Sequence, residues 1–377
     1  MKIGILTWLH NGNYGSLLQA FALQRFLRDS GYEVENIDLC PSLSEKVLNL
    51  LVQGNSCKLF LEKLNLYRIE HASRDKKASA ERKMKFESFL KDEFILTRVF
   101  KKFSDLKELR GRYDVFVCGS DQIWSPTLFS PSYYFDFLLD SDTKIAYACS
   151  FGVSQVCNKK KNRIAKLLSR FHSISVREQE GREIVKELTG RDVKVNLDPT
   201  MLMDANQWNL NVPQEPLIQG NYMFCYFLSY NSEQWNRTIT LAKDRNIKIV
   251  VIPTIKEVYN VSDAVIVENV GPADWVNLIK NASIVCTDSF HGCVFSIIYN
   301  RPFVAFKRFL NDSKHSQNSR VYNLLNSFGL ESVLVDDNKE YYPMDFNEDT
   351  WSMVNKRMKK YSCQSKDWLI QSIQNEK

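Results

Sequence analysis

Short apolar runs recur along the chain, and most of them end in a polar turn that leads into a segment of helical periodicity. Residues 3–8 form the first run; after a turn at 11–16, apolar residues repeat at helical spacing over 17–27, and a second run occupies 32–39. A strand, a helix and a further strand in this order predict a βαβ unit and therefore a parallel sheet.

Two series of such runs divide the chain. We expect further strands at 114–118, 145–148, 173–176 and 193–195, then at 222–228, 248–252, 284–286, 303–306 and 332–335. The pattern predicts an α/β fold of two Rossmann-like lobes with a central cleft. The expected lobes are 1–205, with a helical insertion at about 44–110 that is rich in Lys, Glu and Leu, and 206–345; a final helix in 346–377 is expected to pack back on the first lobe.

Composition indicates a cytoplasmic protein. The 377 residues contain nine cysteines at irregular spacings and no Cys-x-x-Cys pair, which favours reduced thiols over a disulfide, zinc or redox site. No window approaches the ~18 apolar residues of a membrane span. The net charge of +6 is mild, and the basic stretch 74–85 is best read as a solvated helix face. Peripheral contact with the inner face of the membrane stays open as an alternative, and no nucleic-acid partner is expected.

The turn with the most chemistry is Thr287-Asp288-Ser289-Phe290-His291-Gly292. It lies between an apolar run and a segment that reads as a helix, so it is expected at the carboxyl end of a strand, where open α/β sheets bind ligands. The free N–H groups of the new helix favour an anion there, and His291 can move a proton near neutral pH. The alternative is that His291 only bonds the backbone of its turn.

Other strand ends carry polar residues as well. The turn at 11–16 contains Ser16 and two glycines, and the segment 118–126 contains Ser120, Asp121 and Trp124. Asp121 is a candidate to orient a sugar hydroxyl and Trp124 to stack on a sugar ring; a capped turn with a core tryptophan is the alternative.

Three basic residues also follow predicted strands. Arg177 comes just past one strand end and can bind a phosphate or carboxylate through both guanidinium nitrogens, unless it only bridges a neighbouring Glu. Lys307 and Arg320 follow the strand at 303–306 and are candidates to close on an anion, or else they are simply exposed.

Several well-known site patterns are absent from the sequence. It has no Gly-x-Gly-x-x-Gly, no Gly-x-x-x-x-Gly-Lys-Ser/Thr loop, no Gly-x-Ser-x-Gly elbow and no His-Glu-x-x-His pair. His10, His71, His172 and His315 each stand alone and read as structural or exposed rather than as ligands. We therefore expect no metal site and no bound cofactor.

Taken together, the motifs resemble the polysaccharide pyruvyl transferase family. The resemblance rests on motifs that occur in the family's order over about residues 1–330: Asn13-Tyr14-Gly15-Ser16 with Leu18-Gln19-Ala20-Phe21-Ala22-Leu23-Gln24, Cys118-Gly119-Ser120-Asp121-Gln122-Ile123-Trp124, Tyr147-Ala148-Cys149-Ser150-Phe151-Gly152, Ser175-Val176-Arg177-Glu178, Asp198-Pro199-Thr200 and the His291 turn. It implies a fold like that of GT-B glycosyltransferases. It also implies transfer of a pyruvyl group from phosphoenolpyruvate to two hydroxyls of a sugar, in a surface or capsular polysaccharide or its lipid-linked precursor.

This reaction suggests roles for the candidate residues. His291 is expected to transfer a proton, as acid or base. The donor is expected to bind Arg177, Ser16, Ser289, Lys307 and Arg320, and the acceptor Asp121, Trp124 and Ser120. Family members often carry Arg in the turn before the histidine, where this chain has Ser289 and Phe290, so the phosphate-binding role moves toward Arg177, Lys307 and Arg320.

Two other functions stay open at this point. A glycosyltransferase of the same fold would use a nucleotide-sugar donor, although the sequence shows no clear motif for one. A non-catalytic protein that binds glycans or assists their assembly would explain the missing Arg before His291.

Overall fold

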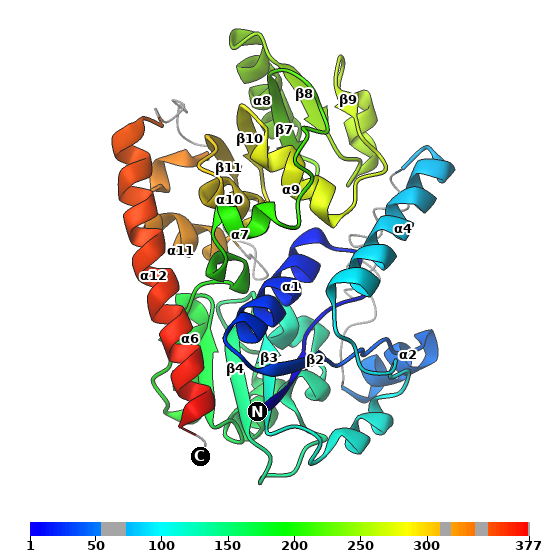
Figure 1. Ribbon diagram of the computed structural model, residues 1–377, viewed down its shortest axis with the longest axis vertical. Helices are drawn as coiled ribbons and strands as arrows, with labels where there is room; N and C mark the ends of the chain where they lie inside the picture. The colour runs from blue at the N-terminus through cyan, green and yellow to red at the C-terminus, as the bar shows by residue number, and fades with distance from the viewer. Residues whose placement is uncertain (54–72, 310–317, 336–345, 376–377) are drawn as a thin grey trace. The chain divides into compact units, whose positions relative to one another are not determined.

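A computed structural model describes residues 1–53, 73–309, 318–335 and 346–375, and these residues form two compact units (Figure 1). Of the described residues, unit 1 contains 1–53, 90–202 and 359–375, and unit 2 contains 73–89, 203–309, 318–335 and 346–358. Each unit is built on a six-stranded parallel sheet, which confirms the predicted α/β fold with two lobes.

The sheet of unit 1 has the strand order β2-β1-β3-β4-β5-β6, and every neighbouring pair is parallel. The strands are β1 (Lys2–Leu6), β2 (Glu33–Asn36), β3 (Val115–Gly119), β4 (Lys144–Cys149), β5 (Ser173–Val176) and β6 (Lys194–Val195). The helices are α1 (Tyr14–Asp29), α2 (Leu43–Val52), α5 (Asn158–Leu168) and α6 (Gln179–Thr189), with 3-10 turns η2 (Phe103–Leu109), η3 (Gln122–Trp124), η4 (Pro126–Leu128), η5 (Pro131–Tyr134) and η6 (Pro199–Leu202).

Both faces of this sheet are buried. Val117 of β3 shares a cluster with Leu23 of α1 and Leu369 near the end of the chain, whereas its neighbour Phe116 shares a second cluster with Leu168 of α5. Side chains that alternate along a strand point to opposite faces, so different helices cover the two faces. Polar side chains that follow the strands therefore collect at the strand ends.

The sheet of unit 2 has the order β12-β11-β10-β7-β8-β9 and is also parallel throughout. Its strands are β7 (Tyr222–Tyr226), β8 (Lys248–Val251), β9 (Val265–Ile266), β10 (Ile284–Thr287), β11 (Phe303–Phe306) and β12 (Leu334–Val335). The helices are α7 (Ala205–Asn209), α8 (Ser232–Asp244), α9 (Pro272–Lys280), α10 (Phe290–Ile298) and α11 (Ser319–Phe328), with 3-10 turns η7 (Lys256–Asn260) and η8 (Glu331–Val333). The sequence pattern missed β9 because this strand has two residues and neither is buried.

Aromatic side chains hold α9 and α10 on one face of this sheet. The Trp275 ring of α9 lies 5.2 Å from Tyr226 of β7 and 5.4 Å from Phe295 of α10, edge to face in both cases. On the other face, Trp235 of α8 joins a buried cluster with Cys225 of β7. This packing fixes the start of α10 against the ends of β7 and β10.

The helical insertion was expected in the first lobe, but the structure places part of it in unit 2. Helix α4 (Lys76–Glu93) belongs to unit 2 as far as Phe89, and residues 54–72 lie outside the described part of the chain. Lys85 of α4 forms an ion pair of 2.7 Å with Asp274 of α9, and Asn269 donates a hydrogen bond to Glu81. These polar contacts explain why α4 groups with the second sheet rather than the first.

The final helix, α12 (Glu348–Gln374), is the longest helix among the described residues. In its second half Leu369 and Ile373 are fully buried in the cluster that contains Val117, and the Ser365 hydroxyl accepts a hydrogen bond of 3.0 Å from the Leu197 amide. Within the described residues, neither α12 nor any other helix is long and apolar enough to cross a bilayer.

Candidate active site

In unit 1, a buried ionic network lies at the carboxyl ends of β3 and β5. Arg177 donates to Asp198 at 2.5 Å and pairs with Asp121 at 3.4 Å, and all three side chains are almost completely buried. Ser120 and Thr200 also donate to Asp198, at 3.2 and 2.7 Å. The sequence-predicted residues Ser120, Asp121 and Arg177 are thus brought together, and Asp198 lies among them.

The charge of this network is unfavourable for an anionic ligand. Burial lowers the pKa of the Arg177 guanidinium, but the negative charges of Asp198, Asp121 and Glu178 outweigh burial and raise it above its ordinary value. Arg177 therefore stays charged, and the carboxylates beside it outnumber it. The expectation that Arg177 binds the donor does not agree with this placement, because its charge is already balanced.

Ser16 lies in the first turn of α1, where it joins the same network. Its hydroxyl donates to Asp121 and accepts a hydrogen bond of 2.9 Å from the Asn11 side chain. Asn13 caps the helix by accepting the Ser16 amide at 3.1 Å. Ser16 is therefore placed to hold Asp121 rather than to bind a phosphate. Asp121 itself has a positive φ of 60°, a conformation that a non-glycine residue adopts only when its surroundings fix it.

Trp124 is a core residue and not a stacking surface. Its indole is fully buried, lies parallel to Tyr134 with the ring centroids 5.1 Å apart, and donates through Nε1 to the Tyr133 carbonyl at 3.1 Å. The expectation that Trp124 stacks on a sugar ring is corrected here, because neither face of the indole is open. The alternative of a capped turn with a core tryptophan describes the structure.

In unit 2, the turn between β10 and α10 has the predicted strand–turn–helix form. Ser289 is the N-cap of α10 and accepts the Gly292 amide at 3.4 Å, while the Thr287 hydroxyl accepts the Ser289 amide and donates to the Tyr226 carbonyl. A Cβ on Gly292 would lie 2.5 Å from the Thr287 hydroxyl, so only glycine fits at this position. The first turn of α10 is therefore held tightly against the end of β10.

Asp288 connects this turn to the end of β7. Its carboxylate accepts the Leu228 amide at 2.7 Å and the Ser229 amide and hydroxyl at 3.2 and 2.8 Å. Burial raises the pKa of Asp288, although Arg308 and these hydrogen bonds act in the opposite direction. The role of Asp288 is to position the turn, and the sequence alone did not suggest it.

His291 lies in the first turn of α10 and is 7% exposed. Its ring meets the ring of Phe290 edge to face, with the centroids 5.2 Å apart. The guanidinium carbon of Arg320, from the first turn of α11, lies 6.0 Å from the centroid of the Phe290 ring. The Lys307 ammonium, which follows β11, lies 5.9 Å from the ring of Tyr322, also in α11. Arg320 therefore lies beside the aromatic ring that meets His291, whereas Lys307 lies beside a residue of α11.

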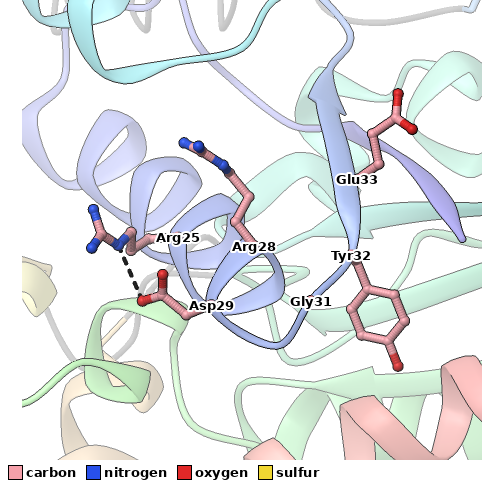
Figure 2. Close-up of a pocket in the computed structure, with 6 residues that line it drawn as sticks. All are labelled: Arg25, Arg28, Asp29, Gly31, Tyr32 and Glu33. Carbon is pink, nitrogen blue, oxygen red and sulfur yellow. Dashed lines mark hydrogen bonds and ion pairs between the residues drawn. The ribbon is translucent and has the colours of Figure 1, made fainter.

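A surface hollow of about 530 Å³ lies elsewhere on unit 1. Figure 2 shows the residues that line it: Arg25, Arg28, Asp29, Gly31, Tyr32 and Glu33. They come from the end of α1 and the start of β2, at the amino edge of the sheet, and Arg25 is bonded to Asp29 at 3.0 Å. Because α/β sheets bind ligands at the carboxyl edge, we do not place the active site in this hollow.

The remaining histidines differ in their surroundings. His172 accepts the Lys144 amide through Nδ1 at 3.0 Å, which is a structural role, and His71 and His315 lie outside the described residues. His10 is bonded to Asp38. Among the described residues, no group of three or more His, Cys, Asp or Glu side chains is arranged to hold a metal ion.

Comparison with known proteins supplies the family. The family model of polysaccharide pyruvyl transferases matches residues 13–308, most of the chain, and this span includes the Ser16, Asp121, Arg177 and His291 motifs. The chain belongs to the polysaccharide pyruvyl transferase family. Membership supports a transferase that acts in polysaccharide modification. A search of curated protein sequences finds no match.

A solved structure with a TM-score of 0.50 supports the fold of this family member, and two others match with lower scores. The Arabidopsis thaliana glycosyltransferase UGT89C1, solved with UDP-L-rhamnose, matches with a TM-score of 0.50 at 11% identity, over 99% of this chain and 98% of that one. UDP-GlcNAc 2-epimerase from Methanocaldococcus jannaschii matches at 11% identity with a TM-score of 0.45, over 96% and 100% of the two chains. The E. coli heptosyltransferase WaaC matches at 11% identity with a TM-score of 0.37, over 86% and 99%. The fold is the two-lobed α/β fold of GT-B-like proteins; at these identities the comparison extends to the fold alone.

Proposed function

We propose that this protein transfers the pyruvyl group of phosphoenolpyruvate to two hydroxyls of a sugar and forms a ketal. The acceptor is a surface or capsular polysaccharide, or its lipid-linked precursor at the inner face of the membrane, and the protein acts in the cytoplasm. The family assignment supports the reaction class. The observation that carries the proposal is the placement of Arg320 over Phe290, next to His291.

The donor suits the residues around the start of α10. Phosphoenolpyruvate carries a phosphate and a carboxylate, and the free N–H groups of a helix start together with arginine and lysine bind such anions. We assign Ser289, Lys307 and Arg320 to the donor. Arg320 provides from another helix the positive charge that this chain's turn lacks before His291.

The proton balance of the reaction gives His291 a role. A proton must reach the methylene carbon of the donor, which leaves positive charge on the adjacent carbon. The first sugar hydroxyl attacks that carbon, phosphate leaves, the second hydroxyl closes the ketal, and the two hydroxyls together release two protons. One of these replaces the proton given to the methylene carbon, and the other leaves with phosphate. We assign proton transfer at the donor to His291.

We assign recognition of the acceptor to the network of unit 1. A carboxylate such as Asp121 accepts hydrogen bonds from sugar hydroxyls. Asp121 is held in place by Ser16 and Arg177, and Ser120 is fully buried and donates to Asp198 and to the Ala148 carbonyl. We therefore propose that Asp121 contacts the acceptor, and that Ser16, Ser120 and Arg177 position it.

The experiment uses the purified protein, phosphoenolpyruvate and the total glycan extract of cells that lack the gene. Phosphate release is measured together with the mass of the glycan, for the wild type, His291→Gln and the control His172→Gln. The proposal predicts release that requires the extract, a glycan heavier by one pyruvyl ketal, and a loss of about 100-fold or more in His291→Gln alone.

The same experiment separates the alternatives. If the wild type releases no phosphate, and phosphoenolpyruvate does not raise its melting temperature, the proposal is wrong. A rise in melting temperature with UDP or ADP instead would favour a nucleotide-sugar donor. Absence of a response to either class of donor would favour the non-catalytic function.

A further inference from the structure

A second histidine of this chain is paired with a buried carboxylate. The Nε2 atom of His10 lies 2.5 Å from Oδ1 of Asp38, where the imidazole side chain is 30% exposed and the carboxylate 6% exposed. An ionised carboxylate can only accept a hydrogen bond, so Nε2 carries the hydrogen, and in the neutral form of the ring the lone pair lies on Nδ1. A carboxylate that fixes the tautomer of an accessible imidazole is the arrangement of a general base.

The backbone on both sides of Asp38 holds the carboxylate in place. The Asp38 amide donates to the Thr97 hydroxyl at 2.9 Å, and the Phe100 amide donates to the Asp38 carbonyl at 2.7 Å. The Thr97 hydroxyl donates in turn to the Arg98 carbonyl at 2.9 Å. Asp38 is therefore anchored to the segment that pairs beside β2, and the imidazole bonded to it has a defined position.

The pair lies at the carboxyl edge of the first sheet. His10 follows β1 and Asp38 follows β2, and these strands are neighbours in parallel register. The next residue after His10 is Asn11, whose side chain donates to Ser16, and Ser16 donates to Asp121. A single chain of contacts thus joins the histidine's loop to the proposed acceptor residue. His172, by contrast, uses its ring to hold a backbone amide at the amino end of β4.

We propose that His10 is the general base that removes protons from the acceptor hydroxyls, and that Asp38 is its positioning residue. This inference rests on the proposed function. Ketal formation takes one proton at the methylene carbon and releases two from the hydroxyls, so proton transfer runs in opposite directions at donor and acceptor. At the acceptor, Nδ1 of His10 takes the proton of the attacking sugar hydroxyl as its oxygen forms the new bond to carbon.

The test compares His10→Ala, His10→Gln and Asp38→Asn with the wild type in the phosphate-release assay described above. We expect kcat to fall about 100- to 1,000-fold in the two His10 variants and about 10- to 100-fold in Asp38→Asn. The Kd for phosphoenolpyruvate, measured by calorimetry, should stay within twofold of the wild type. Added imidazole should restore part of the turnover of His10→Ala, because the free base replaces the missing ring, and should not restore Asp38→Asn, in which the ring of His10 is still present.

The other possible outcomes contradict either the role of His10 or the proposed function. If the wild type forms the ketal and His10→Ala is equally active, His10 is not the base, and the proposed function stands. If His10→Ala has a lowered kcat that imidazole does not restore, His10 has a structural role. The same conclusion follows if its Kd for phosphoenolpyruvate rises while its kcat falls. A wild type that releases no phosphate overturns the proposed function, and this inference falls with it. Melting curves of all variants exclude unfolding as the cause, with His10→Gln and Asp38→Asn as the replacements closest in shape.

Discussion

The guanidinium carbon of Arg320 lies 6.0 Å from the centroid of the Phe290 ring, so α11, which starts 29 residues after the start of α10, brings positive charge to the first turn of α10. The turn itself, Ser289-Phe290-His291, has no basic residue. The relation between Arg320 and Phe290 therefore places a basic side chain beside a turn that has none of its own.

Replacing Arg320 with Ala should weaken phosphoenolpyruvate binding by about 10- to 100-fold, because a charge-assisted contact to the donor is lost. Calorimetry measures the Kd. Arg237→Ala is the matched control, because Arg237 lies in the same unit and pairs with Glu233 at 2.6 Å on the surface of α8. Equal affinities of the wild type and Arg320→Ala would show that Arg320 does not bind the donor.

Asp198→Ala should destabilise unit 1 by about 3–5 kcal/mol, because it removes the nearer carboxylate from a buried arginine. The free energy of unfolding is measured by urea titration followed by circular dichroism. Asp192→Ala removes an exposed partner of Arg182, at 2.7 Å, and should leave the free energy of unfolding close to that of the wild type. If the two variants are equally stable, Arg177 is not held by a buried ion pair.

Trp124→Phe should lower the free energy of unfolding by about 1–3 kcal/mol and leave the KM for the glycan unchanged. The smaller ring leaves a cavity beside Tyr134 and loses the bond to the Tyr133 carbonyl. Thermal melting and the phosphate-release assay measure the two quantities. A variant with wild-type stability and a raised KM would restore Trp124 to the acceptor site.

Glu35 should make unit 1 sensitive to acid. Partial burial raises the pKa of its carboxyl, but the hydrogen bond from Tyr113 and the charges of Arg112 and Lys2 outweigh burial and hold the pKa below its ordinary value. A carboxyl with a lowered pKa in the folded state adds stability above the pKa of the unfolded chain. That stability is lost as the pH falls through the lowered value.

Glu35→Gln should therefore lower the free energy of unfolding by about 1 kcal/mol at neutral pH, and this difference should vanish as the pH falls through the lowered pKa of Glu35. Urea titrations at several pH values measure the difference. Glu33→Gln is the control, because Glu33 is largely exposed and pairs only weakly with Lys2. The same difference for Glu35→Gln at both ends of the pH range would contradict the role given to its ionised form.

The sequence predicts strands, turns and helices well, because these depend on residues that are close together in the chain. The strand before Thr287, the turn after it and the helix that follows are predicted by local pattern, and the structure has all three. The role of Trp124 depends on a pocket made by Tyr134, Phe151 and Phe171, which no local pattern reveals.

The hydrogen-bonded pairs Arg177–Asp198 and His10–Asp38 were also missed, because their partners are far apart in the sequence. Arg177 pairs with Asp198, 21 residues away, and His10 pairs with Asp38, 28 residues away and just after the neighbouring strand. Each of these residues follows a predicted strand or, for Asp38, lies near the end of one, so the topology of the sheet was the signal that brings them together. Without the packed structure, Arg177 reads as an open anion site and His10 as an isolated histidine.

The most direct test of the central claim is the mass spectrum of the glycan after reaction with phosphoenolpyruvate in deuterium oxide, for the wild type and His291→Gln. Protonation of the donor carbon during transfer would place one deuterium in the methyl group of a newly formed pyruvyl ketal. We predict that the wild type gives this product and that His291→Gln forms it at least about 100-fold more slowly. A glycan without the ketal, or equal rates for the two proteins, would contradict the account.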